Sequence, residues 1–479
     1  MAGLVAYGAY VPCWRLERTA IASALGGSAG RGTRSVASYD EDSTSMAVEA
    51  GRAALASAPD GWRAGAVVLA TSTPAYQDKT NATAVHSALG LPDSAGAYDF
   101  AGSARSAGGA LRFARTSSIQ TLVVASDMRT GLPGGPDESG GGDAAVALVF
   151  GDGPALVEVL GEASSSDEFL DRWRTPGDQS SRVWEERFGE SVYVPLAQAA
   201  VTEAFKSAGI TAEEVDHLVV TGLHARAARA VAAWVGARND TLVDDLTSLI
   251  GNTGAAHPGL LLAAVLDRAA PGDLIAVVHL ADGADATVYR ATEALAAYRR
   301  SSPAPVVADL VASGRPGLPY ATFLTWRGQL RREPPRRPDP EAPAAPPSRR
   351  NERWKFAFTA SRCDRCGTRH LPPARVCHSC HAADAMSPEH LAGVGGTIAT
   401  FTVDRLAFSL SPPVVAAVID FDGGGRYQCE MADVDPAEVE IGKRVAMTFR
   451  RLYTAGNGVH DYFWKARLAT KEPDTKEIG

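Results

Sequence analysis

The 479-residue sequence predicts an α/β protein, in which a duplicated, layered α/β region precedes a cysteine-rich ribbon and a small all-β barrel. Near-continuous apolar strands alternate with helical segments over residues 1–325, which is typical of a parallel-rich sheet covered on both faces. Four of the six cysteines lie within eighteen residues of one another. Short strands at turn-limited spacing follow them.

The α/β region carries a faint internal duplication at a spacing of about 150 residues. The matching pairs of a helix and a strand are Glu49–Ser57 with Ala66–Thr71, and Ala199–Ser207 with Asp216–Thr221. Two later apolar strands, Thr121–Ser126 and Leu274–His279, match in the same order. We therefore expect two halves, about 1–163 and 164–325, with a functional site between them.

Residues 326–355 differ sharply in composition from the α/β region. They contain seven prolines and nine Arg or Lys side chains. Such a proline-rich segment predicts a semi-rigid linker. Its positive charge is either solvated or available to the phosphates of a ligand or to a partner.

Two Cys-x-x-Cys pairs, Cys363 with Cys366 and Cys377 with Cys380, are separated by ten residues. This spacing predicts a tetrahedral Zn²⁺ site, and the glycine and prolines between the pairs favour the tight turns of a zinc ribbon. Four protein ligands leave the ion no open position, which indicates a structural metal. Two disulfides, or redox use of the cysteines, are the alternatives. We expect the ribbon to cover 356–385.

The region after the ribbon predicts five short strands, which suit a small barrel of the OB type. The strand segments are Thr397–Val403, Val414–Phe421, Arg426–Met431, Arg444–Phe449 and Tyr462–Arg467. A glycine-rich turn, Asp422–Gly425, joins the second and third strands as a hairpin. We expect the barrel over 386–470 and a tail over 471–479, with Cys429 packed inside the barrel and Cys13 inert.

Charge and hydropathy exclude several classes of function. The formal net charge is −8, and the predicted barrel has no dense aromatic and basic face, so we expect no nucleic-acid partner. The opening residues have no basic segment, and their apolar run is too short for a signal peptide. No stretch approaches eighteen uninterrupted apolar residues. We therefore expect a protein of the cytoplasm with no membrane span.

Several motifs carry a family resemblance. Ile250-Gly-Asn-Thr253, followed by an apolar helix and a Pro-Gly-Asp turn, resembles the corresponding segment of the thiolase superfamily, specifically of hydroxymethylglutaryl-CoA synthases and ketoacyl-acyl-carrier-protein synthase III. Phe169–Gly177 and Gly142–Gly151 are also similar to hydroxymethylglutaryl-CoA synthases. The ribbon and barrel resemble acyl-CoA-associated OB-fold proteins that partner thiolases and thiolase-like aldolases. The resemblance implies a duplicated thiolase-like fold and a coenzyme A thioester as substrate or ligand.

The position of the family's nucleophile departs from the family pattern. In that family a cysteine stands at the start of the helix after the third strand, and Ala104 matches its place here. Alanine cannot form an acyl-enzyme. Ser103 and Ser106 are close in sequence, but a serine needs a base for activation, and serines at helix starts are usually caps.

The family's other catalytic positions match in part. The glutamate of the synthases is replaced by Ser72, whereas Tyr76 and Lys79 on the same segment fit the pattern. By analogy with thiolase-like aldolases that use tyrosine, Tyr76 or Tyr98 is a candidate base. Lys79 is alternatively a solvated loop charge.

The histidine and asparagine of the family have counterparts in the second half. Local pattern places the histidine at His224, whereas counting along the preceding strand places Thr221 there. Asn252 matches the family's asparagine within the Ile-Gly-Asn-Thr motif. His257, at the start of the next helix, projects into the same cleft, caps the helix or lies at the surface.

The resemblance implies that the cysteine accepts the acyl group while histidine and asparagine donate hydrogen bonds to the thioester oxygen. Losing the cysteine removes Claisen chemistry through an acyl-enzyme, but enolate stabilisation is retained at least in part. We interpret the protein as acting in aldol or retro-aldol chemistry of CoA thioesters, with Asn252, His224, His257 and Tyr76 as candidate catalytic residues. The alternative is a non-catalytic CoA-binding scaffold subunit that partners an intact thiolase or thiolase-like aldolase.

The resemblance also predicts the oligomeric state. Thiolase-like folds form dimers, so we expect a homodimer, or a hetero-complex with a thiolase-family subunit. The apolar run Thr121–Ser126 is the strand that we expect to pair across the dimer, because it is too regular to stand exposed at an edge.

Overall fold

The computed structural model describes residues 2–27, 30–238, 240–336 and 341–469. Two compact units make up the chain. The first contains Met1–Ala37, Asp42–Thr83 and Pro92–Gln329, and the second contains Ser38–Glu41, Ala84–Leu91 and Leu330–Gly479. The tail predicted for 471–479 lies outside the described residues, as does the 337–340 part of the predicted linker.

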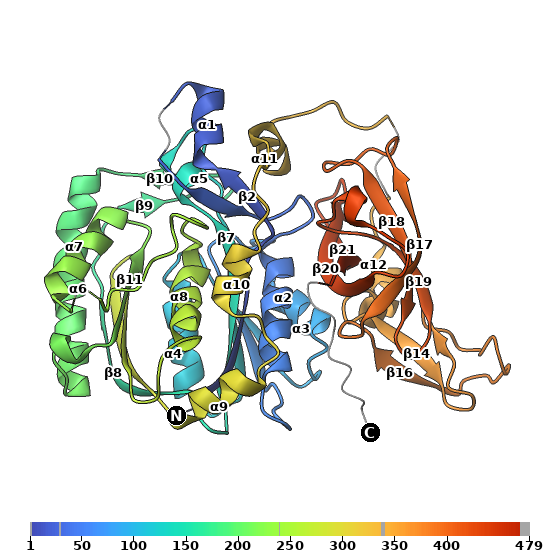
Figure 1. Ribbon diagram of the computed structural model, residues 1–479, viewed down its shortest axis with the longest axis horizontal. Coiled ribbons are helices and arrows are strands. Elements are labelled where there is room, and N and C mark those ends of the chain that lie inside the picture. Colours follow the sequence, from blue (N-terminus) through green and yellow to red (C-terminus); the bar gives the residue numbers. More distant parts are fainter. Residues whose placement is uncertain (1, 28–29, 239, 337–340, 470–479) are drawn as a thin grey trace. The chain divides into compact units, whose positions relative to one another are not determined.

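A five-stranded sheet forms one half of the first unit (Figure 1). Its order is β1 (Gly3–Tyr10), β7 (Asp143–Gly151), β6 (Thr121–Met128), β4 (Ala66–Thr71) and β5 (Gly96–Ala101). The last three strands are parallel, and β7 runs antiparallel to both of its neighbours. The central strands are buried along their length, which explains their near-continuous apolar sequence.

The second sheet repeats the order of the first. It contains β11 (His217–Gly222), β12 (Leu274–Leu280), β13 (Ala284–Ala291) and β8 (Val157–Ser165). Again the first two strands are parallel and the others antiparallel, and Leu242 makes a parallel bridge to Leu218 where β5 stands in the first sheet. The predicted duplication is therefore confirmed. Because β8 belongs to the second sheet, that sheet begins before residue 164, where the sequence suggested the division.

Helices and sheets alternate in layers within the first unit. Helices α4 (Ser106–Thr116) and α8 (His257–Leu266) lie between the two sheets, and α8 contacts strands of both (Figure 1). The outer faces are covered by α2 (Ser43–Ala56) on the first sheet, and by α6 (Glu186–Ala208) and α7 (Ala225–Val235) on the second. Nearly every residue of α8 is apolar and buried, as a helix between two sheets requires.

Shorter elements complete the first unit. They are β2 (Trp14–Glu17), α1 (Arg18–Leu25), β3 (Thr33–Val36), α5 (Pro136–Gly140), β9 (Arg172–Trp173), β10 (Arg182–Val183), α9 (Glu293–Ser301), α10 (Val307–Ala312) and α11 (Tyr320–Trp326). Most of α3 (Ala82–Ala88) belongs to the second unit. Strands β9 and β10 form a small ribbon of their own. Among the described residues, no helix combines the length and the apolar character needed to cross a membrane.

The strand expected at a dimer interface occupies a different place. Strand β6, which contains Thr121–Ser126, pairs with β7 on one side and β4 on the other. Both of its edges are thus hydrogen-bonded within the sheet, so the prediction that it pairs with a second copy is wrong. Its apolar regularity reflects burial on both faces. The edge strand on this side is β5, whose Tyr98 is half exposed.

The second unit contains a three-stranded sheet and a five-stranded one. The small sheet has the order β15 (Arg369–His370), β14 (Thr359–Cys363) and β16 (Met386–His390). The larger has the order β19 (Arg426–Glu430), β18 (Val414–Phe421), β17 (Gly396–Asp404), β20 (Arg444–Thr454) and β21 (His460–Leu468). A parallel bridge from Met431 to Ala466 brings the two edge strands together, which closes the predicted OB barrel.

Aromatic rings fill the barrel. Phe358 is fully buried and contacts Phe421 and Trp464, which also packs on Phe449. Cys429 is buried in the barrel, as predicted, and burial raises the pKa of its thiol to about 12. The segment predicted as a linker contains two short helices, α12 (Ala345–Arg350) and α13 (Glu352–Lys355).

Candidate functional site

A small cleft of about 70 Å³ opens in the first unit, where the parallel strands of both sheets end. Ligand sites in open α/β sheets lie outside the carboxyl ends of the strands, which is the position of this cleft. The lining residues come from loops that follow β4, β5, β6, β11 and β12, together with β9 and α6. They are Ser72, Gly102, Ser103, Ala104, Arg129, Asp171, Arg172, Trp173, Arg174, Ser181, Tyr193, Leu223, Leu280, Ala281 and Asp282.

Ala104 lies in the loop between β5 and α4 and lines the cleft with its methyl group, at 5% exposure. The methyl group of Ala104 cannot act as a nucleophile. The hydroxyl oxygen of Ser103 accepts a hydrogen bond from the Arg105 N–H at 3.2 Å, as a loop-capping serine does. Ser106 is the first residue of α4.

Ser72 also lines the cleft, and a buried carboxylate behind it holds it in place. The Ser72 hydroxyl donates to Asp127 Oδ2 at 2.7 Å, and the Ser72 backbone N–H donates to Oδ1 at 2.6 Å. Asp127 also accepts hydrogen bonds from the hydroxyls of Thr71 and Thr73, and from the Ala255 N–H at 2.7 Å. The carboxylate thus joins the loop after β4, in the first half, to the loop before α8, in the second.

Three arginines line the cleft, beside the carboxylates of Asp171 and Asp282. Arg174 donates to the backbone oxygen of Ser72, and Arg172 pairs with Asp137. Arg129 approaches the Ser72 hydroxyl at 3.4 Å, and its burial lowers the pKa of its guanidinium, with Asp127 opposing that effect. A cleft with this lining favours an anionic group or a reaction in which negative charge develops.

The opposite part of the lining contains a carboxyl group and a phenol. Asp171 precedes β9, is only 4% exposed, and lies near Tyr193, which lines the same cleft. The Tyr193 oxygen in turn accepts from the Asp282 N–H at 3.3 Å. His224 lies against the Tyr193 ring, with centroids 5.8 Å apart.

The structure separates the two positions proposed for the family's histidine. His224 caps α7, and its Nδ1 accepts the Ala227 N–H at 3.0 Å. The side chain is buried beside Tyr193 and Asp171, which line the cleft, but His224 itself is not one of the lining residues. Thr221 is a buried residue of β11, paired with His279 in the sheet.

Asn252 and His257 lie in the loop and first turn that lead into α8. The Asn252 amide donates to the Gly222 oxygen at 3.0 Å, and its oxygen accepts the Gly254 N–H at 2.9 Å. His257 is fully buried, its Nδ1 lies within 3.2 Å of the Thr253 N–H, and burial lowers the pKa of its ring to about 4. It is therefore neither at the surface nor in the cleft lining.

Tyr76 and Lys79 line a second, shallower hollow, together with Tyr98 and Asp99. The structure therefore does not bring Tyr76 or Tyr98 to the cleft that contains Ala104. The Lys79 ammonium donates to Thr80 and Thr83 in its own loop. Partial burial lowers the pKa of Lys79, with Asp99 opposing that effect.

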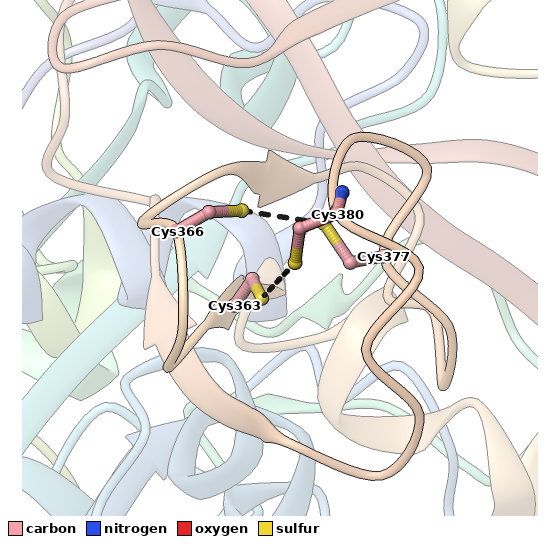
Figure 2. Close-up of side chains that lie close together, drawn as sticks. All are labelled: Cys363, Cys366, Cys377 and Cys380. Atoms are coloured by element: carbon pink, nitrogen blue, oxygen red, sulfur yellow. Dashed lines mark hydrogen bonds between the residues drawn. The ribbon is translucent and has the colours of Figure 1, made fainter.

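The four cysteines of the second unit come together as predicted (Figure 2). Their sulfur atoms all lie within 4.8 Å of one another, with 3.6 Å between Cys363 and Cys380 and 3.5 Å between Cys366 and Cys377. Tetrahedral Zn²⁺ with bonds of about 2.3 Å needs sulfur separations of about 3.8 Å. The residues thus fit a structural zinc ion, and a hydrogen bond with Thr368 helps lower the pKa of Cys366 to about 6.

Several cleft residues were not predicted from the sequence, namely Asp127, Arg129, Arg172, Arg174, Tyr193 and Asp171. The motif Phe169–Gly177, which carried part of the family resemblance, contains three of them. The one acidic and two basic side chains of that motif are the sequence signal that could have indicated these site residues. Asp127 and Arg129 end a buried strand, which is a usual place for site residues in parallel sheets.

The two small parts of the second unit match known family models. Residues 356–386 match the rubredoxin-like zinc ribbon domain of ChsH2, and residues 389–450 match the C-terminal OB-fold domain of ChsH2.

Curated relatives and solved structures match most of the rest. The chain is 30% identical over 327 residues to a hydroxymethylglutaryl-CoA synthase of Methanopyrus kandleri, covering 63% of this chain and 91% of the relative. It is also 30% identical over 346 residues to that of Aeropyrum pernix, covering 69% and 95%. FabH, the 3-oxoacyl-(acyl carrier protein) synthase III of Pseudomonas aeruginosa, is 25% identical with a TM-score of 0.54, covering 61% of this chain and 98% of FabH.

A structure of MvaS in complex with 3-hydroxy-3-methylglutaryl coenzyme A shares the fold, at 20% identity and a TM-score of 0.55, covering 72% of this chain and 94% of MvaS. The sequence identity to the synthases over nearly their whole length shows the family. The chain therefore belongs to the hydroxymethylglutaryl-CoA synthase family, extended by a zinc ribbon and an OB-fold domain.

Proposed function

We propose that this protein makes or breaks a carbon–carbon bond of a CoA thioester by aldol or retro-aldol chemistry, without an acyl-cysteine intermediate. The observation that carries the proposal is Ala104, whose methyl group lines the cleft where the family's cysteine is expected. The rest of the lining keeps polar and cationic groups rather than closing over. A degenerate site with no chemistry has no need for them.

The reaction that remains open to such a site passes through a thioester enolate. In the retro-aldol direction, a β-hydroxyacyl-CoA loses its hydroxyl proton, the bond between the α and β carbons breaks, and the electron pair moves to the thioester oxygen. The arginines of the lining favour that developing charge. Asn252 uses one amide hydrogen to hold Gly222, and we assign its second one to the thioester oxygen.

The second candidate function is a non-catalytic scaffold that holds acyl-CoA for a thiolase-family partner. The observation in its favour is that Ser72 and Ala104 together replace both the acid and the nucleophile of the family. Turnover by the purified chain separates the two candidates. A β-hydroxyacyl-CoA should give a free carbonyl compound and a shorter acyl-CoA if the first candidate is right.

The wild-type protein should form no covalent adduct with acetyl-CoA or acetoacetyl-CoA, because none of the described residues that line the cleft is a cysteine. Ala104→Cys should gain one acyl group, since a thiol just before the start of α4 has its pKa lowered by the helix N-terminus. Intact-protein mass spectrometry measures both. A stoichiometric adduct on the wild type would contradict the proposal, and peptide mapping would then test Ser103 and Ser106.

Asn252→Ala should lower turnover by about 10²–10³ with little change in CoA affinity, because it removes an oxyanion donor. Asn252→Asp is the matched variant, since it keeps the acceptor for the Gly254 N–H but has no amide hydrogens. Steady-state kinetics measures the loss of turnover, and a CoA binding titration measures whether the affinity is unchanged. Full activity in the aspartate variant would show that neither amide hydrogen of Asn252 is needed for turnover.

A further inference from the structure

Asp171 differs from every other carboxylate near the cleft. Asp127 is saturated by five hydrogen bonds, Asp137 pairs with Arg172, and Asp282 is exposed. Asp171 lines the cleft, is 96% buried, and makes no ion pair with a lysine or arginine within the described part of the chain. Its Oδ1 has no hydrogen-bond partner there.

The groups around Asp171 come from three other elements. Tyr193 belongs to α6, His224 lies at the start of α7, and Asp282 follows β12. A Cβ at position 189 of α6 would lie 2.5 Å from Asp171 Oδ1 and 2.8 Å from His224 Nε2. Glycine at this position therefore gives the carboxylate and the imidazole the space to approach each other behind the cleft.

The protonation of Asp171 is balanced between opposing effects. Burial raises its pKa, and Asp282 adds to that effect, whereas His224, Arg172 and the nearby Tyr193 hydroxyl oppose it. The net result is a carboxyl group with a pKa above the ordinary value, and so a stronger base than a surface aspartate.

We propose that Asp171 is the catalytic base of the cleft, a role that rests on the proposed function. In the retro-aldol direction its carboxylate takes the proton of the β-hydroxyl group while the bond between the α and β carbons breaks. The carbonyl product leaves, and the resulting carboxylic acid returns the same proton to the α carbon of the enolate. No oxidant or further reactant is needed. His224 and Tyr193 position the carboxylate and do not touch the reacting atoms.

Asp171→Asn should lower turnover of a β-hydroxyacyl-CoA by about 10²–10⁴, because the amide cannot accept the proton. It should also abolish exchange of the acetyl-CoA methyl protons with D₂O, followed by NMR, while acetyl-CoA still binds. Asp178→Asn is the matched control, because Asp178 is an exposed residue of the same loop. It should leave turnover and exchange unchanged.

The pH profile gives a second test that does not depend on the asparagine variant folding. The rate should fall as pH falls through the pKa of Asp171, above the range of an ordinary aspartate near 3.9. Tyr193→Phe removes a hydroxyl group that favours the ionised carboxylate, so the acid limb of kcat/KM should move to higher pH. If the acid limb of kcat/KM does not move in Tyr193→Phe, or if Asp171→Asn has normal turnover, the role of Asp171 is overturned while the proposed function stands. A wild-type protein with no turnover would remove the proposed function as well.

Discussion

Removing zinc, or replacing Cys363 with serine, should unfold the zinc ribbon and leave the first unit folded. Apart from the metal site of the four cysteines, the ribbon has only a small apolar core. Its own apolar cluster consists of Cys363, Cys377 and Ala382, with Ala385 and Met386 packed against them. Structural zinc in small ribbon-like domains contributes apparent binding free energies of about 10–16 kcal/mol, far more than so small a core supplies.

Hydrogen exchange read by mass spectrometry measures this effect. The amides of residues 356–390 should lose protection in the Cys363→Ser variant, while those of strands β4, β6 and β12 keep it. Metal analysis should give one zinc per wild-type chain. Cys429→Ser is the control, because it makes the same substitution at a buried cysteine outside the cluster and should retain the metal. A ribbon that stays protected without metal would refute the prediction.

The architecture could be predicted because each part has a local signal. Buried strands such as Val67–Leu69 are continuous apolar runs, and the cysteine spacing determines the metal geometry directly. The position of β6 was misjudged because apolar regularity tells how deeply a strand is buried but not which strands are its neighbours. The order of the strands depends on how the connections cross over the sheet, and the sequence of a single strand does not reveal those connections.

The cleft was predicted less completely, because its chemistry depends on residues far apart in the chain. Asp127 contacts Ser72 and Ala255, which are 55 and 128 residues away. Tyr76 matched a family pattern, yet its loop turns the ring into a different hollow. Local motifs indicated several of the loops that line this cleft, but which side chain of each loop enters the cleft depends on packing between the two halves.

Asp127→Asn should be among the most destabilising single substitutions in the first unit. The carboxylate is fully buried and accepts two backbone N–H groups and three hydroxyls. An asparagine keeps one oxygen and places an NH₂ group against donors that need an acceptor. The hydroxyls can turn to other partners, but a backbone N–H cannot. Each buried donor left without a partner costs about 1–3 kcal/mol, so we expect a loss of roughly 2–4 kcal/mol in the free energy of unfolding.

Chemical denaturation of the first unit, followed by tryptophan fluorescence, measures the loss as a lower midpoint with an unchanged slope. Asp152→Asn is the control, since Asp152 is exposed and should change the free energy by less than about 0.5 kcal/mol. Because Asp127 holds both the Ser72 loop and the Ala255 loop, the same variant should also weaken acyl-CoA binding. A variant as stable as the control would mean that the five hydrogen bonds contribute little, and that the two halves are held at the cleft by apolar packing alone.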